Sequence, residues 1–348
     1  MSHSKAHVAI IGAGVAGAAC ARFLSDAGLK VQVFDKSRGV GGRMTTRRLD
    51  WPDAAGALHS ARFDHGAPCF SAHSSEFAGF TLQAQSEGLL SRWTPRMAPG
   101  SEVPLSGADL WVPLPDMPAL CRSLLADLPV QTSSMVDALR REPDGWSLES
   151  LGANLNSGLN PPQRFTAVVI AIPPLQAAVL LQPYQTVWAQ HAQALPMLPG
   201  WALMGVTDDD DVFSAWDLAC PPVGPLAWVV RNDAKSGRVR VPGLAHWVVH
   251  ATAAWSQAHL ESSAAEVQAA LQEALAQNLG QSLTWHHAVA HRWRYASVPH
   301  ANTQVKPYEW DASAGLGVCG DAWGGKGVEG AWLSGRALAK ALLTSHQG

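Results

Sequence analysis

A glycine-punctuated segment near the amino terminus constrains the fold of this chain more than any other feature. The apolar run Val8–Ile11 meets Gly12, Gly14 and Gly17 and continues into an alanine-rich stretch. The spacing predicts a strand, a tight turn and a helix: Gly12 permits the turn, Gly14 leaves the backbone open to a phosphate group, and Gly17 lets helix and strand pack closely. The helix N-terminus then offers unpaired N–H groups and a positive dipole end to an anion.

A second strand, Lys30–Phe34, supplies the other half of the pattern. It ends on Asp35, roughly 20 residues beyond the glycines, where a carboxylate can accept both hydroxyls of an adenosine ribose. An exposed aspartate that merely closes a strand would not need this spacing. We therefore predict an α/β fold with a parallel sheet that binds an adenine dinucleotide whose ribose carries no phosphate.

The basic, glycine-rich residues 36–47 follow the ribose-binding strand directly. A simple nicotinamide dehydrogenase does not need such a segment, whereas an extended flavin dinucleotide needs a second positive group on its pyrophosphate. Arg43 can supply that group because Gly41 and Gly42 permit close approach. The alternative interpretation is a surface loop.

Several of these blocks resemble one family. Residues 35–43 resemble the second fingerprint of the flavin-dependent amine oxidase superfamily, and Gly41–Thr46 is similar to the renalases in particular. Residues 62–67 look like the family segment that runs beneath the flavin ring, and 316–331 look like its last flavin-binding strand, loop and helix. The resemblance implies a Rossmann-type FAD-binding domain with an inserted α+β substrate domain built on an antiparallel sheet, the p-hydroxybenzoate hydroxylase-like architecture.

The same resemblance implies a set of contacts to non-covalent FAD. Asp321 can accept a ribityl hydroxyl, and the helix that starts near Val328 can stabilise negative charge on the reduced ring. The backbone of Val136 would lie against the adenine. The expected contacts are Gly12, Ala13, Gly14, Val15, Ala16, Gly17, Asp35, Lys36, Arg38, Gly41, Gly42, Arg43, Met44, Asp64, His65, Gly66, Val136, Gly320, Asp321, Val328, Glu329, Gly330 and Ala331.

We expect the two domains to alternate along the chain. Residues 1–70, 109–173 and 313–348 would form the FAD-binding domain, and residues 71–108 and 174–312 the substrate domain. Pro173–Pro174 marks the boundary into the long stretch of the substrate domain because it ends the apolar strand Phe165–Ile172. Residues 130–149 predict a three-stranded antiparallel meander on the first domain, residues 151–162 a loop, and residues 263–279 a single helix among the tryptophan-rich strands of the second domain.

The composition excludes several classes of protein. The 348 residues carry a net charge of −3, so no basic field points to nucleic acid, and no apolar run is long enough to span a membrane. The five cysteines follow no pairing pattern, which predicts reduced thiols and a cytoplasmic location. They are Cys20, Cys69, Cys121, Cys220 and Cys319.

Three tempting sites are better explained by structure than by chemistry. His287 and His291 lie on one face of a predicted strand without a carboxylate to complete a metal site. Asp208–Asp211 lacks the glycine-centred loop of a calcium site and suits a solvated hairpin tip. Cys319 lies inside a strand, so it suits a small buried side chain better than a covalent flavin anchor. We predict no metal.

The reaction is inferred from the resemblance. Renalases oxidise 2- or 6-dihydroNAD(P) isomers to NAD(P)+ by hydride transfer to flavin N5, with O2 as an acceptor that yields H2O2. The amine oxidase branch places a lysine near N5, and none of the lysines here falls in a predicted strand over the flavin. They are Lys5, Lys30, Lys36, Lys235, Lys306, Lys326 and Lys340.

The residues that carry the reaction are unknown, and the substrate-side candidates are His65, Trp293 and Tyr295. The expected partner is a small molecule, a reduced nicotinamide dinucleotide; the oligomeric state cannot be read from the sequence. Two alternatives stay open: a flavin amine oxidase or desaturase-type dehydrogenase acting on another small molecule, and a non-catalytic nucleotide-binding protein.

Overall fold

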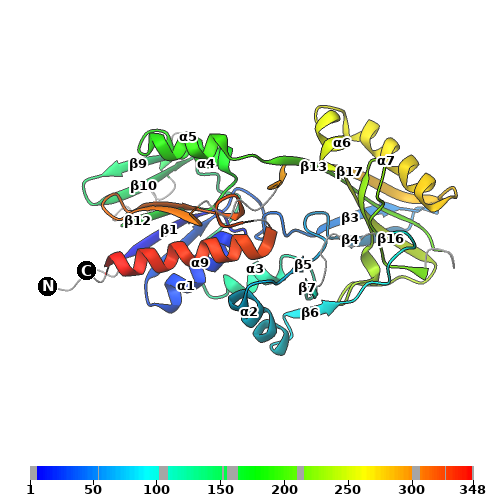
Figure 1. Ribbon diagram of the computed structural model, residues 1–348, viewed down its shortest axis with the longest axis horizontal. Helices are drawn as coiled ribbons and strands as arrows, with labels where there is room; N and C mark the ends of the chain where they lie inside the picture. The colour runs from blue at the N-terminus through cyan, green and yellow to red at the C-terminus, as the bar shows by residue number, and fades with distance from the viewer. Residues whose placement is uncertain are drawn as a thin grey trace. The chain divides into compact units, whose positions relative to one another are not determined.

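The computed structural model describes residues 6–53, 55–101, 109–150, 153–154, 164–209, 215–299, 306–325 and 327–346. They fall into two compact units, each assembled from separate stretches of chain (Figure 1). Unit 1 comprises Met1–Gly42, Leu120–Met197 and Val298–Gly348, and unit 2 comprises Arg43–Ala119 and Leu198–Ser297. Lys5, Lys326 and nearly all of the loop expected over residues 151–162 lie outside the described residues.

Unit 1 is built on a mostly parallel six-stranded sheet in the order β18-β19-β12-β1-β2-β8. Its strands are β1 (His7–Ile11), β2 (Lys30–Phe34), β8 (Val130–Gln131), β12 (Ala167–Ile170), β18 (Tyr308–Asp311) and β19 (Leu316–Cys319). Strand β1 pairs in parallel with β2 and β12, whereas the edge strand β18 runs antiparallel to β19. The continuous apolar sequences of β1 and β12 are typical of strands buried on both faces.

Two long helices of unit 1 lie side by side, α1 (Val15–Asp26) and α9 (Gly327–His346). Their backbones approach so closely that a Cβ atom on Gly335 would overlap the carbonyl oxygen of Ala16. The shorter helices are α3 (Ala119–Leu124), which starts at the unit boundary, α4 (Pro174–Leu181), α5 (Thr186–Ala194) and α8 (Asp321–Gly324).

Helices α4 and α5 were expected in the substrate domain, yet they belong to unit 1. Ala177 and Leu181 are buried in the same core as Val168 of β12. Pro174 is the first residue of α4. Backbone N–H groups in the first turn of a helix have no acceptor within the helix, so a proline there breaks no hydrogen bond. The proline pair is therefore a strand-to-helix turn within unit 1.

A small antiparallel sheet, β11-β10-β9, completes unit 1. Its strands are β9 (Ala138–Glu142), β10 (Gly145–Ser150) and β11 (Ala153–Asn154). The predicted meander is confirmed for β9 and β10 and is wrong for Val130–Gln131, which pairs in parallel with β2 at the edge of the large sheet. A strand of two residues carries too little alternation to indicate its sheet.

Unit 2 contains a five-stranded antiparallel sheet in the order β14-β15-β16-β13-β17. Its strands are β13 (Leu198–Asp208), β14 (Leu218–Ala219), β15 (Leu226–Arg231), β16 (Leu244–Ala251) and β17 (Trp285–Ser297). Helix α7 (Ala264–Leu279) packs on one face, and the hairpin of β3 (Arg47–Pro52) and β4 (Leu58–Phe63) packs on the other. Because side chains alternate along a strand, Leu203 lies under α7 and Met204 under the hairpin.

The predicted helix at 263–279 is confirmed as α7, and its start is fixed locally. Ser263 accepts a hydrogen bond from the N–H of Glu266 at 3.3 Å and donates its own N–H to that carboxylate at 2.8 Å, a capping box. Gly280, with φ of +71°, ends the helix. A further helix, α6 (Ala253–Ala258), precedes it and was not predicted.

The remaining elements of unit 2 form a smaller layer. A three-stranded sheet in the order β5-β7-β6 contains β5 (Phe70–Ser71), β6 (Leu90–Trp93) and β7 (Leu110–Pro113), accompanied by α2 (Ser75–Ser86) and the 3₁₀ turn η2 (Asn232–Ala234). Residues 43–70 and 109–119 therefore belong to unit 2, whereas the expected domains gave them to the FAD-binding part. Among the described residues, every helix is too short or too polar to cross a bilayer.

Candidate functional site

The glycine turn between β1 and α1 has the geometry that its sequence predicts. Gly12 has φ of +108° and donates its N–H to the carbonyl oxygen of Phe34 at 2.8 Å. A Cβ atom on Gly12 would overlap the carbonyl oxygen of Ala171, and one on Gly17 would overlap the carbonyl oxygen of Gly12. Glycine alone fits both positions, and their close contacts hold strand and helix together.

Asp35, the predicted ribose acceptor, is held in place by the main chain. It is 8% exposed at the end of β2. One carboxylate oxygen accepts the N–H of Ala13 at 2.7 Å, and the other accepts the N–H of Ser37 at 2.7 Å. Each carboxylate oxygen has a second lone pair, so the oriented group can still receive ribose hydroxyls.

The second glycine loop lies against the first within unit 1. The N–H of Gly41 donates to the carbonyl oxygen of Ala13 at 2.9 Å, and a Cβ atom on Gly42 would stand 3.3 Å from Cα of Gly14. Gly14 itself caps α1 without any side-chain hydrogen bond to the helix start, and the first turn of α1 carries no acidic residue. An open helix N-terminus lined by two glycine segments fits a pyrophosphate.

The carboxyl-terminal block also forms the predicted strand, turn and helix. Strand β19 is followed by Gly320, whose N–H donates to Oγ of Ser334 in α9 at 2.9 Å. Asp321 is 5% exposed and opens the short helix α8. A Cβ atom on Gly330, in the first turns of α9, would overlap the carbonyl oxygen of Gly325. The backbone around Gly325 lies so close to Gly330 that only glycine fits at position 330.

Unit 1 thus brings together most of the residues predicted to contact FAD. These are Gly12, Ala13, Gly14, Val15, Ala16, Gly17, Asp35, Lys36, Arg38, Gly41, Gly42, Val136, Gly320, Asp321, Val328, Glu329, Gly330 and Ala331. Within this set, Lys36 and Arg38 are exposed, and Lys36 Nζ donates to Gln176 Oε1 at 3.1 Å. Val136 is 7% exposed and its side chain is part of the core. Their contacts to FAD stay a prediction.

The other predicted contacts, from Arg43 to Gly66, lie in unit 2. The N–H of Ala67 donates to the carbonyl oxygen of Arg43 at 2.9 Å, and a Cβ atom on Gly66 would overlap the same oxygen. Arg43 Nη1 donates to the carbonyl oxygen of Ala296 at 3.3 Å, and Met44 is 2% exposed. The segments around Arg43 and Gly66 are therefore packed against each other.

A buried ion cluster holds the Asp64 end of this segment. Asp64 is inaccessible to solvent, and its Oδ2 lies 2.5 Å from Lys235 Nζ and 2.8 Å from Arg238 Nη2. Thr46 donates to the other carboxylate oxygen at 2.6 Å. Burial favours the neutral acid, but the two cations and the hydrogen bonds prevail and lower the pKa of Asp64 below its usual value.

Lys235 was not recognised in the sequence as part of any site. It follows η2 rather than lying within a strand, its side chain is wholly buried, and its ammonium group also donates to the carbonyl oxygen of Pro68 at 3.1 Å. Burial lowers the pKa of Lys235, and the charge of Asp64 opposes that shift. No local pattern indicates this role, because Lys235 and Asp64 meet only through the tertiary fold.

Two of the three substrate-side candidates, His65 and Trp293, are in contact. Their ring centroids lie 5.3 Å apart, and Trp293 Nε1 donates to the carbonyl oxygen of His65 at 3.0 Å. His291 joins them, at 4.9 Å from His65 and 4.7 Å from Trp293. For Tyr295, half-buried further along β17, the described residues show no ring contact with this group.

The histidines of this group are neutral at pH 7. Burial, followed by the proximity of His291, lowers the pKa of His65 to about 3, and burial lowers the pKa of His250 to about 4. His250 Nε2 donates to the carbonyl oxygen of Gly66 at 2.9 Å. The Nδ1 atom of His65 is buried and has no hydrogen-bond partner in the described part of the chain. Buried polar atoms usually have a hydrogen-bond partner, and binding of a ligand is one way to supply it.

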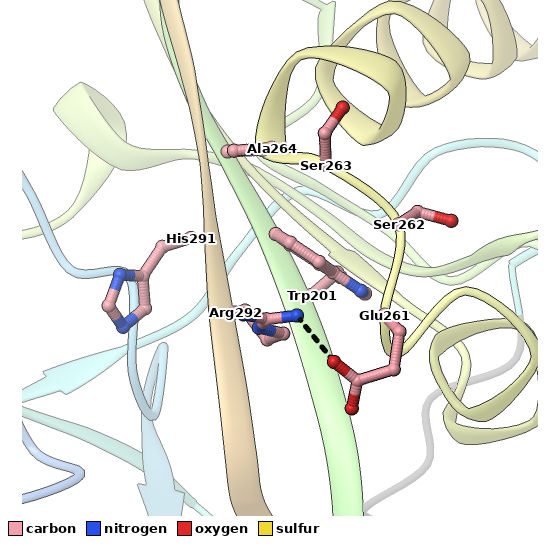
Figure 2. Close-up of a pocket in the computed structure, with 8 residues that line it drawn as sticks. Trp201, Glu261, Ser262, Ser263, Ala264, His291 and Arg292 are labelled. Carbon is pink, nitrogen blue, oxygen red and sulfur yellow. Dashed lines mark hydrogen bonds and ion pairs between the residues drawn. The ribbon is translucent and has the colours of Figure 1, made fainter.

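A cavity of about 530 Å³ lies in unit 2 beside strand β17 (Figure 2). Arg292 Nη1 donates to the carbonyl oxygen of Leu260 at 2.7 Å and pairs with Glu261 at 3.3 Å. Ser263 is engaged in the helix cap, while His291 points away from Glu261 across the strand. Arg292, Glu261 and Ser263 therefore already have partners and do not converge unpaired on a ligand.

Apart from His291, which joins the ring group above, the residues discounted from the sequence have structural contacts in the described part of the chain. His287 stacks on Trp51 with ring centroids 5.7 Å apart. Asp208 pairs with His286 at 2.7 Å, while Asp210 and Asp211 lie outside the described residues. Cys319 is buried, and burial raises the pKa of its thiol to about 12. Among the described residues, no three histidine, cysteine or acidic side chains form a metal-binding group.

The fold places the chain in a recognisable structural class. Residues 10–80 match the NAD(P)-binding Rossmann-like domain. A candidate protoporphyrinogen oxidase from Exiguobacterium sp. 255-15 superposes with a TM-score of 0.70 at 11% identity, covering 99% of this chain and 100% of that one. Cyclohexylamine oxidase from Brevibacterium oxydans IH-35A gives 0.65 at 15% identity, with the same coverage of both chains. The chain therefore has the Rossmann-based α/β fold that these oxidases share.

One curated relative is similar in sequence as well. It is the tRNA 5-methylaminomethyl-2-thiouridine biosynthesis bifunctional protein MnmC of Magnetococcus marinus, 28% identical over 206 residues. The similarity covers 49% of this chain and 30% of that protein. This chain thus matches less than a third of the relative's length.

Proposed function

We propose that the chain is an FAD-dependent oxidoreductase that binds its cofactor without a covalent bond. The main support is the arrangement at the N-terminus of α1, where Gly14, the Gly41–Gly42 loop and Asp35 lie together. The glycines leave the space that a pyrophosphate needs, and Asp35 offers the ribose acceptor. A bound flavin would supply the hydride acceptor of the reaction.

We further propose that the substrate is a 2- or 6-dihydroNAD(P) isomer, as the similarity to the renalases implies. The donor would lose a hydride to flavin N5 and leave as NAD(P)+, and O2 would then take up two electrons and two protons to give H2O2. The ring group of His65, His291 and Trp293 supports a planar substrate, because these side chains are neutral and stack readily. Hydride transfer from such a donor needs no acid or base, so alignment is the protein's main task.

An amine donor is the second candidate. It is favoured by the fold, which is shared with cyclohexylamine oxidase and with putrescine oxidase at a TM-score of 0.63 and 14% identity. A non-catalytic nucleotide-binding protein is the third. The cytoplasmic location and the identity of the substrate-contacting residues stay predictions.

The test is the colour of the purified protein followed by anaerobic reduction. We expect oxidised-flavin absorbance and release of free FAD on denaturation. The dihydronicotinamide isomers should bleach the flavin faster than ordinary NADH, and cyclohexylamine should not bleach it. Faster bleaching by the amine would favour the second candidate, an unbleachable flavin the third, and a colourless protein that takes up no FAD would contradict the proposal.

A further inference from the structure

The hairpin β3–β4 presents one arginine to the same face that carries the histidine and tryptophan rings. Residues 47, 49 and 51 of β3 share a face because side chains alternate along a strand. Leu49 and Trp51 are buried on that face against the five-stranded sheet, so Arg47 points the same way. Arg47 is nevertheless exposed to solvent, which leaves its guanidinium open to a ligand.

The pairing within the hairpin places Arg47 near His65. Trp51 stacks on His287, and Arg47 lies four residues, about 13 Å, before Trp51 on the same face of β3. Arg47 pairs with Phe63 in the hairpin, two residues before His65. The positive charge of Arg47 helps to lower the pKa of His65, His287 and His291, which agrees with this placement.

No acidic side chain compensates Arg47 in the described part of unit 2. The nearby Asp64 is bound to two buried cations, Lys235 and Arg238. Asp50, on the opposite face of β3, pairs with Arg48 at 2.9 Å. The histidines around Arg47 are neutral, so its charge stands uncancelled beside a set of aromatic rings.

We propose that Arg47 selects the substrate by charge: together with His65 and His291 it binds the anionic group of a planar donor and disfavours cationic amines. The inference rests on the proposed oxidoreductase function and narrows it to anionic substrates. An exposed guanidinium forms hydrogen-bonded pairs with carboxylate and phosphate oxygens, and the neutral rings add stacking without adding charge. The same guanidinium repels an ammonium group that approaches the rings.

Three probes of equal size and different charge test this selection: benzoate, benzamide and benzylammonium. Their affinities for the purified holoprotein are measured by isothermal titration calorimetry at fixed ionic strength and neutral pH. We expect benzoate to bind at least about fivefold more tightly than benzamide, and benzylammonium more weakly than either. Calorimetry does not depend on turnover, so failure of the proposed reaction and failure of the charge selection are separate results.

Substitutions of neighbouring arginines identify the residue responsible. R47Q should make benzoate and benzamide bind equally, and R47E should reverse the order of benzoate and benzylammonium. R48Q is the matched control, since Arg48 is the next residue and points to the opposite face; it should keep the wild-type order. Three results would overturn the proposal. The wild type could bind no benzoate or bind all three probes equally, or R47Q could keep the preference for benzoate.

Discussion

Unit 1 and unit 2 hold their candidate functional residues by different means. In unit 1 the main chain does so: Gly12, Gly17 and Gly42 each sit where a Cβ atom would meet another backbone. In unit 2 side chains do so, since Asp64 is fixed by Lys235 and His65 by Trp293, over large separations in sequence. The first kind of site is therefore sensitive to added atoms, and the second to lost charges and hydrogen-bond donors.

Gly12→Ala should have the largest effect because it adds an atom where unit 1 has no room. The new Cβ would overlap the carbonyl oxygen of Ala171 at a φ that only glycine adopts readily. We expect the variant to purify without flavin or to bind FAD at least about 100-fold more weakly. A loss of that size corresponds to more than about 2.7 kcal/mol of strain in the cofactor-binding conformation. The flavin-to-protein absorbance ratio and FAD titration measure this loss.

Gly28→Ala is its control, since Gly28 also has a positive φ, of +87°, but its missing Cβ would meet nothing within 4 Å. This variant should keep its flavin and lose about 1 kcal/mol of stability. Equal flavin loss in both variants would show that backbone strain, and not the close approach of main chains, decides cofactor binding in unit 1.

Asp64→Asn tests the side-chain cluster of unit 2 in the same way. The substitution leaves Lys235 and Arg238 buried without their carboxylate, and breaking a buried ion pair by removing one partner costs about 3–5 kcal/mol. Urea unfolding followed by circular dichroism measures the loss. Asp50→Asn, on the same hairpin but at an exposed pair, should leave the midpoint unchanged. A small effect at Asp64 would mean that packing alone holds this segment.

The pH dependence of stability sharpens the contrast, because the histidines with strongly lowered pKa values lie in unit 2. His65 and His250 stay neutral in the folded protein down to a pH of about 3 and about 4, whereas unfolded histidine protonates near pH 6.5. The unfolded chain therefore binds more protons below pH 6.5, and stability should fall as the pH drops from about 6.5 towards about 4.

His250→Gln isolates this contribution, since glutamine can still donate to Gly66 but does not titrate. Between about pH 6 and pH 5 each histidine contributes a slope approaching about 1.4 kcal/mol per pH unit, and less nearer pH 7, where the unfolded histidine is mostly neutral. The variant's free energy of unfolding, measured in urea at pH 7, 6 and 5, should have a slope shallower than wild type by about that amount. An unchanged slope would indicate that His250 titrates alike in both states.

Trp293→Phe should have the smallest effect. It removes the Nε1–H that donates to the carbonyl oxygen of His65, while His250 still reaches that oxygen at 3.3 Å. We expect a loss of about 1 kcal/mol in stability, together with a raised KM if Trp293 contacts the substrate. Trp310→Phe, which removes a 3.3 Å bond to Ser345 in unit 1, should leave KM unchanged. Matching KM values in the two variants would contradict a substrate role for Trp293.

Local sequence spacing explains which parts were predictable. The strand, turn and helix around Gly12 and the helix at 263–279 were predicted because they depend on residues close together in sequence or on a steric need that glycine alone meets. Asp35 was identified for the same reason. Its hydrogen bonds to Ala13 and Ser37 were not foreseen but agree with its expected place.

Other features depend on the tertiary fold and leave no local trace. Lys235 follows the short turn η2, where the sequence suggests an ordinary surface lysine, yet the fold buries it against Asp64. Because Pro173 and Pro174 end the preceding strand, the sequence predicted that α4 belongs to the substrate domain. In the structure its apolar side chains are part of the core of unit 1. Val130–Gln131 joins the parallel sheet by pairing with β2. A strand of two residues has too short a side-chain pattern to predict which strand it pairs with.

The interleaved order of the two units has a consequence for biosynthesis. Strand β12 pairs with β19, and α1 packs on α9, so the large sheet is incomplete until residues 316–346 have left the ribosome. Until then β12 presents an open edge that can pair with other chains. Nascent polypeptides stalled before β19 should be strong clients for chaperones, and cofactor loading should follow translation rather than accompany it.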